Sequence, residues 1–421
     1  MKSRDIQVSL FEMSMCLSNA VDLVSHALVD HHKRVAYIAS SIAVEMGLSL
    51  EIQKDLVMAG LLHDIGAISL KERLDAMDFE LDATHPHAEL GYRLIKTFEP
   101  FSDIAPLVRY HHLSWKNGAA SVFRGEKIPF ASQILHLADR TAVLINMEEE
   151  ILKQSMNICK RIMNDSGEKF VPEMANIFLS ISRKESFWFD VVSSSISQII
   201  AESISAATIE LNIEELLSLA RLFGKIIDFR SRFTATHSSG VAATSETLAK
   251  LSGLLGQECR LIKIAGYLHD LGKLSIPPEI LEKPGKLSAT ENNIIKHHSY
   301  YTFRTIETVK GLDIINAWAS FHHECLDGTG YPFHLKGENL PLGSRIMAVA
   351  DVFTAITEDR PYRLGMSKEK ALYTLQQMAG DFALDPDIVS VLEQNYDEIN
   401  AIRITAQSEE SREYEEFRSQ A

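Results

Sequence analysis

Apolar residues recur at intervals of three and four through most of the chain, the spacing that places them on one face of an α-helix. The segments 21–46 (VDLVSHALVDHHKRVAYIASSIAVEM) and 213–229 (IEELLSLARLFGKIIDF) show it clearly, whereas alternating, strand-like runs are scarce. Gly and Pro gather at 275–287, 327–343 and 382–389, which predicts loops there. The pattern therefore predicts an almost entirely helical protein.

One arrangement of histidines occurs twice along the chain. In each copy the first two histidines lie 32 residues apart and a later pair lies 24 apart: His31, His63, His87 and His111 in the first copy, and His237, His269, His298 and His322 in the second. The segment 125–139 (GEKIPFASQILHLAD) also matches 337–351 (GENLPLGSRIMAVAD) at seven of fifteen positions. Such a repeat predicts a tandem duplication of one helical domain, with copies at 1–205 and 206–405 and a charged tail at 406–421 that we expect to be an exposed helical end.

Composition narrows the class of protein. A chain of 421 residues is longer than a single core usually supports, which agrees with two domains. The formal net charge of −15 argues against nucleic acid or an anionic membrane as partner. We find no signal peptide and no uninterrupted apolar span, and the four cysteines form no CxxC pair. These features predict a cytoplasmic protein.

The recurring residues of the second copy combine imidazole and carboxylate groups without a thiolate, a ligand set that suits first-row divalent metals. Five imidazoles and two carboxylates are too many for one ion that keeps an open position, and they suit two ions about 3.5–4 Å apart. Asp270, directly after His269, is the natural bridge, and water between the ions would become the nucleophile. The predicted ligands are His237, His269, Asp270, His298, His322, His323 and Asp351.

The second copy resembles the HD-GYP family, a bacterial branch of the HD phosphohydrolases. The motifs that carry the resemblance are YLHDLGK (267–273), HHECLDGTGYP (322–332), SRIMAVADVFTAITEDRPYR (344–363) and DFALDPDIV (381–389). The resemblance implies tandem all-α HD domains, two divalent metals, with iron or manganese ahead of magnesium, nickel or zinc, and hydrolysis of a cyclic dinucleotide. Family members with three metals carry a glutamate four residues before the first histidine. Phe233 stands there in this chain, so we expect two metals.

The resemblance also implies roles for single residues. It assigns Asp270 and Lys273 to catalysis, with Lys273 facing the scissile phosphate. Arg360 and Arg363 would bind phosphate oxygens with their forked guanidinium groups. Gly330, Tyr331 and Pro332 would form a loop beside the site. One metal would be held by His237, His269, Asp270 and Asp351, and the other by Asp270, His298, His322 and His323.

The leading functional hypothesis is a phosphodiesterase that converts cyclic di-GMP to linear pGpG, to GMP, or to both. A 3′,3′-cyclic GMP-AMP phosphodiesterase is the alternative, because nothing in the sequence separates guanine from adenine. Two other classes stay open: a non-catalytic receptor for the dinucleotide and a general nucleotide phosphohydrolase. Signalling proteins could bind through the 330–332 loop or the first copy, and a homodimer stays open.

The first copy keeps the ligand types but not the residues expected to bind phosphate. Ala67 stands where Lys273 does, WKNGAAS (115–121) replaces LDGTGYP, and Glu148 and Ile151 replace the arginines. We expect a regulatory or scaffolding domain, with a phosphohydrolase for another nucleotide and a purely structural domain as alternatives. The candidate ligands of a second metal centre are His31, His63, Asp64, His87, His111, His112 and Asp139.

Overall fold

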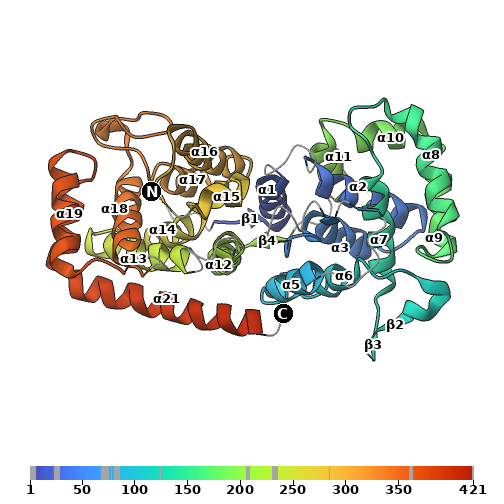
Figure 1. Cartoon of the computed structure of the whole chain (residues 1–421), viewed down its shortest axis with the longest axis horizontal. Coiled ribbons are helices and arrows are strands. Elements are labelled where there is room, and N and C mark those ends of the chain that lie inside the picture. Colours follow the sequence, from blue (N-terminus) through green and yellow to red (C-terminus); the bar gives the residue numbers. More distant parts are fainter. Residues whose placement is uncertain are drawn as a thin grey trace. The chain divides into compact units, whose positions relative to one another are not determined.

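The computed structural model describes residues 6–22, 29–67, 75–76, 78–79, 86–123, 125–204, 209–229, 236–283, 285–359 and 364–419. The chain divides into two compact units, one of Met13–Ile209 and one of Met1–Glu12 with Glu210–Gln420. Helices dominate both units and are joined by loops (Figure 1). The strands of the described part form two short two-stranded sheets, β1 with β4 and β2 with β3. The expected all-α fold is confirmed. No helix among the described residues is both long and apolar enough to span a membrane.

The first unit contains the first set of histidines and aspartates. Its helices α2 and α3 pack closely because Gly60 has no side chain: a Cβ there would lie 2.6 Å from the Ala36 Cα. The elements are α1 (Leu10–Asp22), α2 (His31–Glu45), α3 (Leu50–Leu62), α5 (Pro86–Ile95), η2 (Glu99–Phe101), α6 (Ala105–Tyr110), η3 (Lys116–Ser121), β2 (Val122–Phe123), β3 (Glu126–Lys127), α7 (Phe130–Val143), α8 (Ile151–Asn164), α9 (Pro172–Ile181), α10 (Glu185–Val191) and α11 (Ile196–Ile204).

The second unit repeats this packing. A Cβ on Gly266 would lie 2.6 Å from the Ala242 Cα, and both positions are those of the first-unit pair plus 206 (60 + 206 and 36 + 206). The elements are β1 (Val8–Ser9), β4 (Glu210–Leu211), α12 (Ile213–Phe229), α13 (His237–Leu251), α14 (Gly256–Leu268), η5 (Leu271–Ser275), α15 (Pro278–Leu281), α16 (Ala289–Ile306), α17 (Asp313–Ser320), η6 (Gly337–Asn339), α18 (Leu342–Thr357), α19 (Lys368–Gly380), α20 (Pro386–Gln394) and α21 (Tyr396–Ser419).

The N-terminal segment folds with the second unit, although it precedes the first in sequence. Val8 pairs with Leu211 in the antiparallel β1–β4 ladder. The Lys310 backbone N–H also donates to Glu12 at 3.0 Å. Removing residues 1–205 would therefore remove a strand of the second unit as well.

The charged C-terminal segment forms the last part of a long helix, α21, which packs along α13 (Figure 1). Glu410 is only 3% exposed, and its carboxylate lies 3.2 Å from the Arg221 guanidinium of α12. Arg221 also lies 2.7 Å from Glu413. Part of the segment predicted to be an exposed end is thus anchored to the second unit by buried or partly buried ion pairs.

Candidate metal-binding active site

Five helical elements of the second unit bring the predicted ligands to one buried region. Six of the seven side chains are at most 8% exposed, and His323 is the more accessible one. His237 begins α13, His269 and Asp270 follow α14, His298 lies within α16, His322 and His323 follow α17, and Asp351 lies within α18.

The first group of ligand atoms surrounds the side chains of His269 and Asp351. The Nε2 of His237 lies 3.1 Å from Asp351 Oδ1, and the Nε2 of His269 lies 3.9 Å from the same oxygen. His269 Nε2 also lies 3.0 Å from Asp270 Oδ2. Nitrogen and oxygen ligands of three separate helical segments therefore converge on one small volume.

The second group lies on the other side of the Asp270 carboxylate. His298 Nε2 is 3.5 Å from Asp270 Oδ1 and 3.3 Å from His322 Nε2. The ring of His323 lies with its centroid 5.1 Å from that of His298. Because Oδ2 of Asp270 faces the first group and Oδ1 faces the second, this carboxylate has the arrangement of a bridge between two ions.

Buried polar atoms without partners show that these residues fit a cation. His269 Nε2 and Asp270 Oδ1 have no hydrogen-bond partner among the described residues. Such groups destabilise a fold unless something else binds them. Two sets offer ligand atoms within 4.8 Å of one another, His237 with His269 and Asp270, and His298 with His322 and His323. Divalent metals would satisfy both sets.

Backbone carbonyls orient three of the imidazoles. The Nδ1 of His269 donates to the Gly266 oxygen at 2.8 Å. In the same way His298 donates to Ile295 and His322 to Ala319, each at 2.6 Å. A proton held on Nδ1 leaves Nε2 unprotonated in the neutral ring, so Nε2 points into the cluster as a ligand.

Local electrostatics favour the protonation states that metal binding requires at Asp270 and His298. Burial would raise the pKa of Asp270, but the charges of His269 and Lys273 hold it well below its usual range. Burial lowers the pKa of His298 to about 3, so its ring is neutral near pH 7. Ionised carboxylates and neutral imidazoles are the forms that coordinate divalent metals. Burial would lower the pKa of His237, but Glu358 and Asp351 raise it to about 10, so a metal bound there would have to displace a proton.

The predicted catalytic lysine lies at the edge of this cluster. Lys273 Nζ is 2.5 Å from Asp270 Oδ2, and its side chain is 25% exposed, so it can also reach a bound anion.

The 330–332 loop also borders the cluster: the centroid of the Tyr331 ring lies 4.9 Å from that of the His323 ring. Gly330 lets this loop approach closely, because a Cβ there would lie 2.3 Å from the Cys325 backbone nitrogen. Arg360, Arg363 and Phe233 lie outside the described residues.

The sequence analysis missed buried carboxylates behind the predicted ligands. Asp228 accepts hydrogen bonds from the Ser238 backbone at 2.8 Å and from its hydroxyl at 2.9 Å, next to His237. Asp22 occupies the repeat-equivalent position (228 − 206) and contacts His32. The repeat could have revealed this pair. Glu358 contacts His237 Nδ1 at 3.2 Å, but no equivalent acidic residue in the first copy could have indicated it.

The first unit assembles its own histidines and aspartates in the same way. Asp64 lies between two groups, with Oδ2 3.4 Å from His63 Nε2 and Oδ1 3.1 Å from His87 Nε2. Asp139 lies 3.3 Å from His31 Nε2. Every predicted first-copy ligand is buried: His31, His63, Asp64, His87, His111, His112 and Asp139.

The two clusters differ in the positively charged side chains that lie beside them. Ala67 provides no counterpart of the Lys273 ammonium group. Arg140, only 1% exposed, instead lies 2.7 Å from Asp139 Oδ2. Its guanidinium also donates to the Ala76 carbonyl at 2.7 Å, so its position is fixed inside the unit. The first cluster therefore has an internal positive charge but no lysine at the position that Lys273 occupies beside the second cluster.

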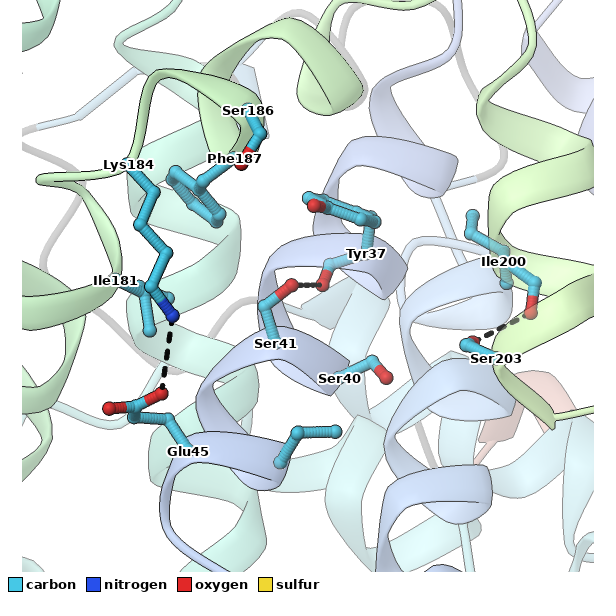
Figure 2. Close-up of a pocket in the computed structure, with 11 residues that line it drawn as sticks. Tyr37, Ser40, Ser41, Glu45, Ile181, Lys184, Ser186, Phe187, Ile200 and Ser203 are labelled. Atoms are coloured by element: carbon cyan, nitrogen blue, oxygen red, sulfur yellow. Dashed lines mark hydrogen bonds and ion pairs between the residues drawn. The ribbon is translucent and has the colours of Figure 1, made fainter.

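A separate cavity of about 240 Å³ opens in the first unit beside α2 (Figure 2). Its walls include stacked rings of Tyr37 and Phe187, with centroids 5.9 Å apart, and several serines. The lysine in its wall, Lys184, lies 3.9 Å from Glu45. No histidine is found among the described residues that line this cavity, so these residues do not supply the ligands of a metal-dependent phosphohydrolase.

Comparisons with known proteins agree with the geometry. Models of the HD domain match residues 28–144 and 221–388. A 3′3′-cGAMP-specific phosphodiesterase of Vibrio cholerae is 32% identical over 94% of both chains. The cyclic di-GMP phosphodiesterase response regulator RpfG of Xanthomonas campestris is 35% identical over 45% of this chain and 50% of its own. A crystal structure of a cyclic GMP-AMP-specific phosphodiesterase of V. cholerae superposes with a TM-score of 0.66 at 23% identity, covering 93% of this chain and 98% of the other.

The fold and the His/Asp clusters define a phosphohydrolase with tandem HD domains, a class that depends on metals. The chain belongs to the HD-GYP-type cyclic dinucleotide phosphodiesterases, as the sequence motifs predicted. It is an enzyme that cleaves phosphodiesters.

Proposed function

We propose that the protein hydrolyses 3′,3′-cyclic GMP-AMP in its second domain. One observation carries the choice of substrate: a relative with this specificity aligns with 94% of the chain. Relatives named as cyclic di-GMP phosphodiesterases, such as RpfG, align with less than half of the chain. The alternative of the sequence analysis is thus better supported than its leading hypothesis, and cyclic di-GMP becomes the second candidate.

In this proposal the second domain holds two divalent ions, iron or manganese. His237, His269 and Asp351 bind one ion, His298, His322 and His323 bind the other, and Asp270 bridges them. When bound, such ions polarise the phosphodiester and make water acidic enough to supply a nucleophile near neutral pH.

The remaining chemistry belongs to side chains. Lys273 compensates negative charge on a phosphoryl oxygen, which it can do because its ammonium group borders the cluster. We assign the same task to Arg360 and Arg363, and contact with a nucleobase to Tyr331. Ring opening gives a linear dinucleotide, and a second cleavage gives mononucleotides.

Turnover of both cyclic dinucleotides tests the substrate. With Mn²⁺ or with Fe²⁺ under anaerobic conditions, the purified protein should hydrolyse cyclic GMP-AMP with at least about 10-fold higher kcat/KM than cyclic di-GMP, a difference of about 1.4 kcal/mol in transition-state binding. Chromatography of the products measures both rates. Faster turnover of cyclic di-GMP would reverse the assignment, and binding without turnover of either would favour a receptor.

For the first domain we propose a metal-binding regulatory or scaffolding role in the cytoplasm, serving contacts with signalling proteins or a second copy of the chain. The support is its intact buried cluster combined with the absence of a lysine at Ala67. The Arg140 guanidinium of this domain already forms an ion pair with Asp139, so this group is poorly placed to bind phosphate.

Metal content tests the first-domain site. If each domain binds two ions, the wild-type chain should contain roughly four, and a His63→Ala/Asp64→Ala variant should contain roughly two. Elemental analysis by mass spectrometry measures the ratio. Equal metal content in both proteins would contradict the first-domain site. Point variants suit this test better than truncation, because β1 belongs to the second unit.

A further inference from the structure

Two carboxylates of α18 and its end enclose the imidazole of His237. Asp351 Oδ1 lies 3.1 Å from Nε2, and Glu358 Oε2 lies 3.2 Å from Nδ1. The two acidic residues are seven positions apart, about two helical turns, which places them on the same side of the helix. Glu358 is 5% exposed, so its contact with the ring is shielded from water.

This contact sets His237 apart from the other oriented histidines of the second domain. His269, His298 and His322 donate Nδ1–H to neutral backbone carbonyls. A carboxylate in that place fixes the Nδ1–H tautomer more strongly and makes Nε2 a more basic ligand. Nε2 is the atom that faces Asp351 and the cluster.

The C-terminal helix α21 holds Glu358 in this position. Gln407 Nε2 donates to Glu358 Oε2 at 3.1 Å and lies 3.3 Å from the Thr236 carbonyl oxygen, directly before His237. Arg403 contacts the Gln407 side-chain oxygen and fixes which end of the amide donates. The Arg403 guanidinium lies 3.5 Å from the Thr357 carbonyl oxygen, which joins the same helix to the end of α18.

The Gln407 amide fits between α21 and α13 because Gly240 of α13 has no side chain. A Cβ on Gly240 would lie 2.9 Å from Gln407 Cδ and 2.9 Å from Thr354 Cγ2, so a larger residue there would displace Gln407. The repeat-equivalent position in the first copy is Arg34 (240 − 206).

The first copy lacks the same support. Asn146 takes the place of Glu358, using the offset of 212 that relates Asp351 to Asp139. Its side chain contacts Glu149 and the Glu148 backbone. The buried Nδ1 of His31 has no hydrogen-bond partner among the described residues. Among the residues that the structure describes, a carboxylate therefore contacts Nδ1 of the first histidine in the second domain and not in the first.

We propose that Glu358 is a positioning residue that sets the metal affinity of His237, and that Gln407 makes the C-terminal helix part of this metal site. The inference rests on the proposed role of His237 as a ligand. Glu358 acts through the imidazole, and Gln407 acts through Glu358 and through the backbone of Thr236.

Manganese binding to metal-free protein tests this inference without any need for turnover. Glu358→Ala should weaken binding of one Mn²⁺ by about 10- to 100-fold, the usual effect of losing the partner of a metal-bound histidine. Glu358→Gln should recover part of the loss, because its amide oxygen still accepts from Nδ1–H. Gln407→Ala should show a smaller loss, and that loss should shrink further in the Glu358→Ala background, where only the Gln407 contact with the Thr236 carbonyl oxygen remains to be lost.

Electron paramagnetic resonance of free and bound Mn²⁺ measures these affinities, and the melting temperature of the metal-free protein reports on folding. Glu409→Ala, an exposed acidic residue of the same helix, is the control and should bind as wild type does. The inference would be overturned if Glu358→Ala bound Mn²⁺ as tightly as wild type does. It would also be overturned if Glu358→Gln bound Mn²⁺ as weakly as Glu358→Ala. His237→Ala separates the two proposals: if it keeps both ions, the assigned ligand itself is wrong.

Discussion

Asp270→Asn is expected to reduce kcat/KM for cyclic dinucleotide hydrolysis by at least about 1,000-fold, since losing several kcal/mol of transition-state stabilisation corresponds to a factor of that size. The carboxylate faces His269 with one oxygen and His298 with the other. An amide keeps the shape of the side chain but loses the negative charge, and its nitrogen cannot coordinate a cation. Initial rates at several substrate concentrations, with metal content measured on the same sample, test the expectation.

The duplication supplies a matched control. Asp64→Asn makes the same change between His63 and His87 in the first domain, where the aspartate is likewise buried and the distances are similar. We expect it to change the metal content of the first domain and to leave a rate within about 10-fold of wild type, because Ala67 offers no charge to a phosphate. If Asp64→Asn abolished hydrolysis and Asp270→Asn did not, the first domain would be the catalytic one.

Lys273→Ala is expected to lower kcat by about 100- to 1,000-fold, the usual effect of removing one group that stabilises developing charge. Metal content should stay near that of wild type, because the ligand groups remain and only an ammonium group 2.5 Å from Asp270 is lost. Removing this neighbouring cation also relieves repulsion of a divalent ion. Single-turnover rates with saturating metal separate the chemical step from metal binding.

Lys283→Ala provides the control for this variant. Lys283 pairs with Glu291 at 2.7 Å on the surface of the same domain, so its removal changes net charge equally without touching the cluster. We expect unchanged kcat. A Lys273→Ala enzyme with wild-type kcat would exclude the assigned role, whereas a rate lost in step with metal content would make Lys273 a group that supports metal binding only.

Much of the site was predictable from the sequence because the duplication preserves spacing. The interval of 32 residues between His31 and His63 recurs between His237 and His269, and these histidines lie at equivalent helix ends in both domains. A periodic apolar pattern similarly predicted helices, since burial of one face requires it. Ligand identity and fold class are therefore properties that local sequence can encode.

The contacts behind the ligands depend on packing between distant segments. Glu358 and Gln407 are 49 residues apart and meet only because α21 lies along α13. Neither has a periodic or repeated signal, and the charged composition of 406–421 resembles that of an exposed end. Arg140 is also indistinguishable in sequence from a surface arginine, yet it is buried against Asp139.

The sequence by itself determined which residue types recur, at what spacing and in how many copies, because those properties follow from local periodicity and from the duplication. The sequence also showed that Ala67 stands in place of Lys273. Only the tertiary structure decided which groups these side chains contact: Lys273 lies beside Asp270, Arg140 lies against Asp139, and Glu358 lies behind His237. The physical reason is that hydrogen bonds and ion pairs form between neighbours in space, and packing of the helices selects those neighbours.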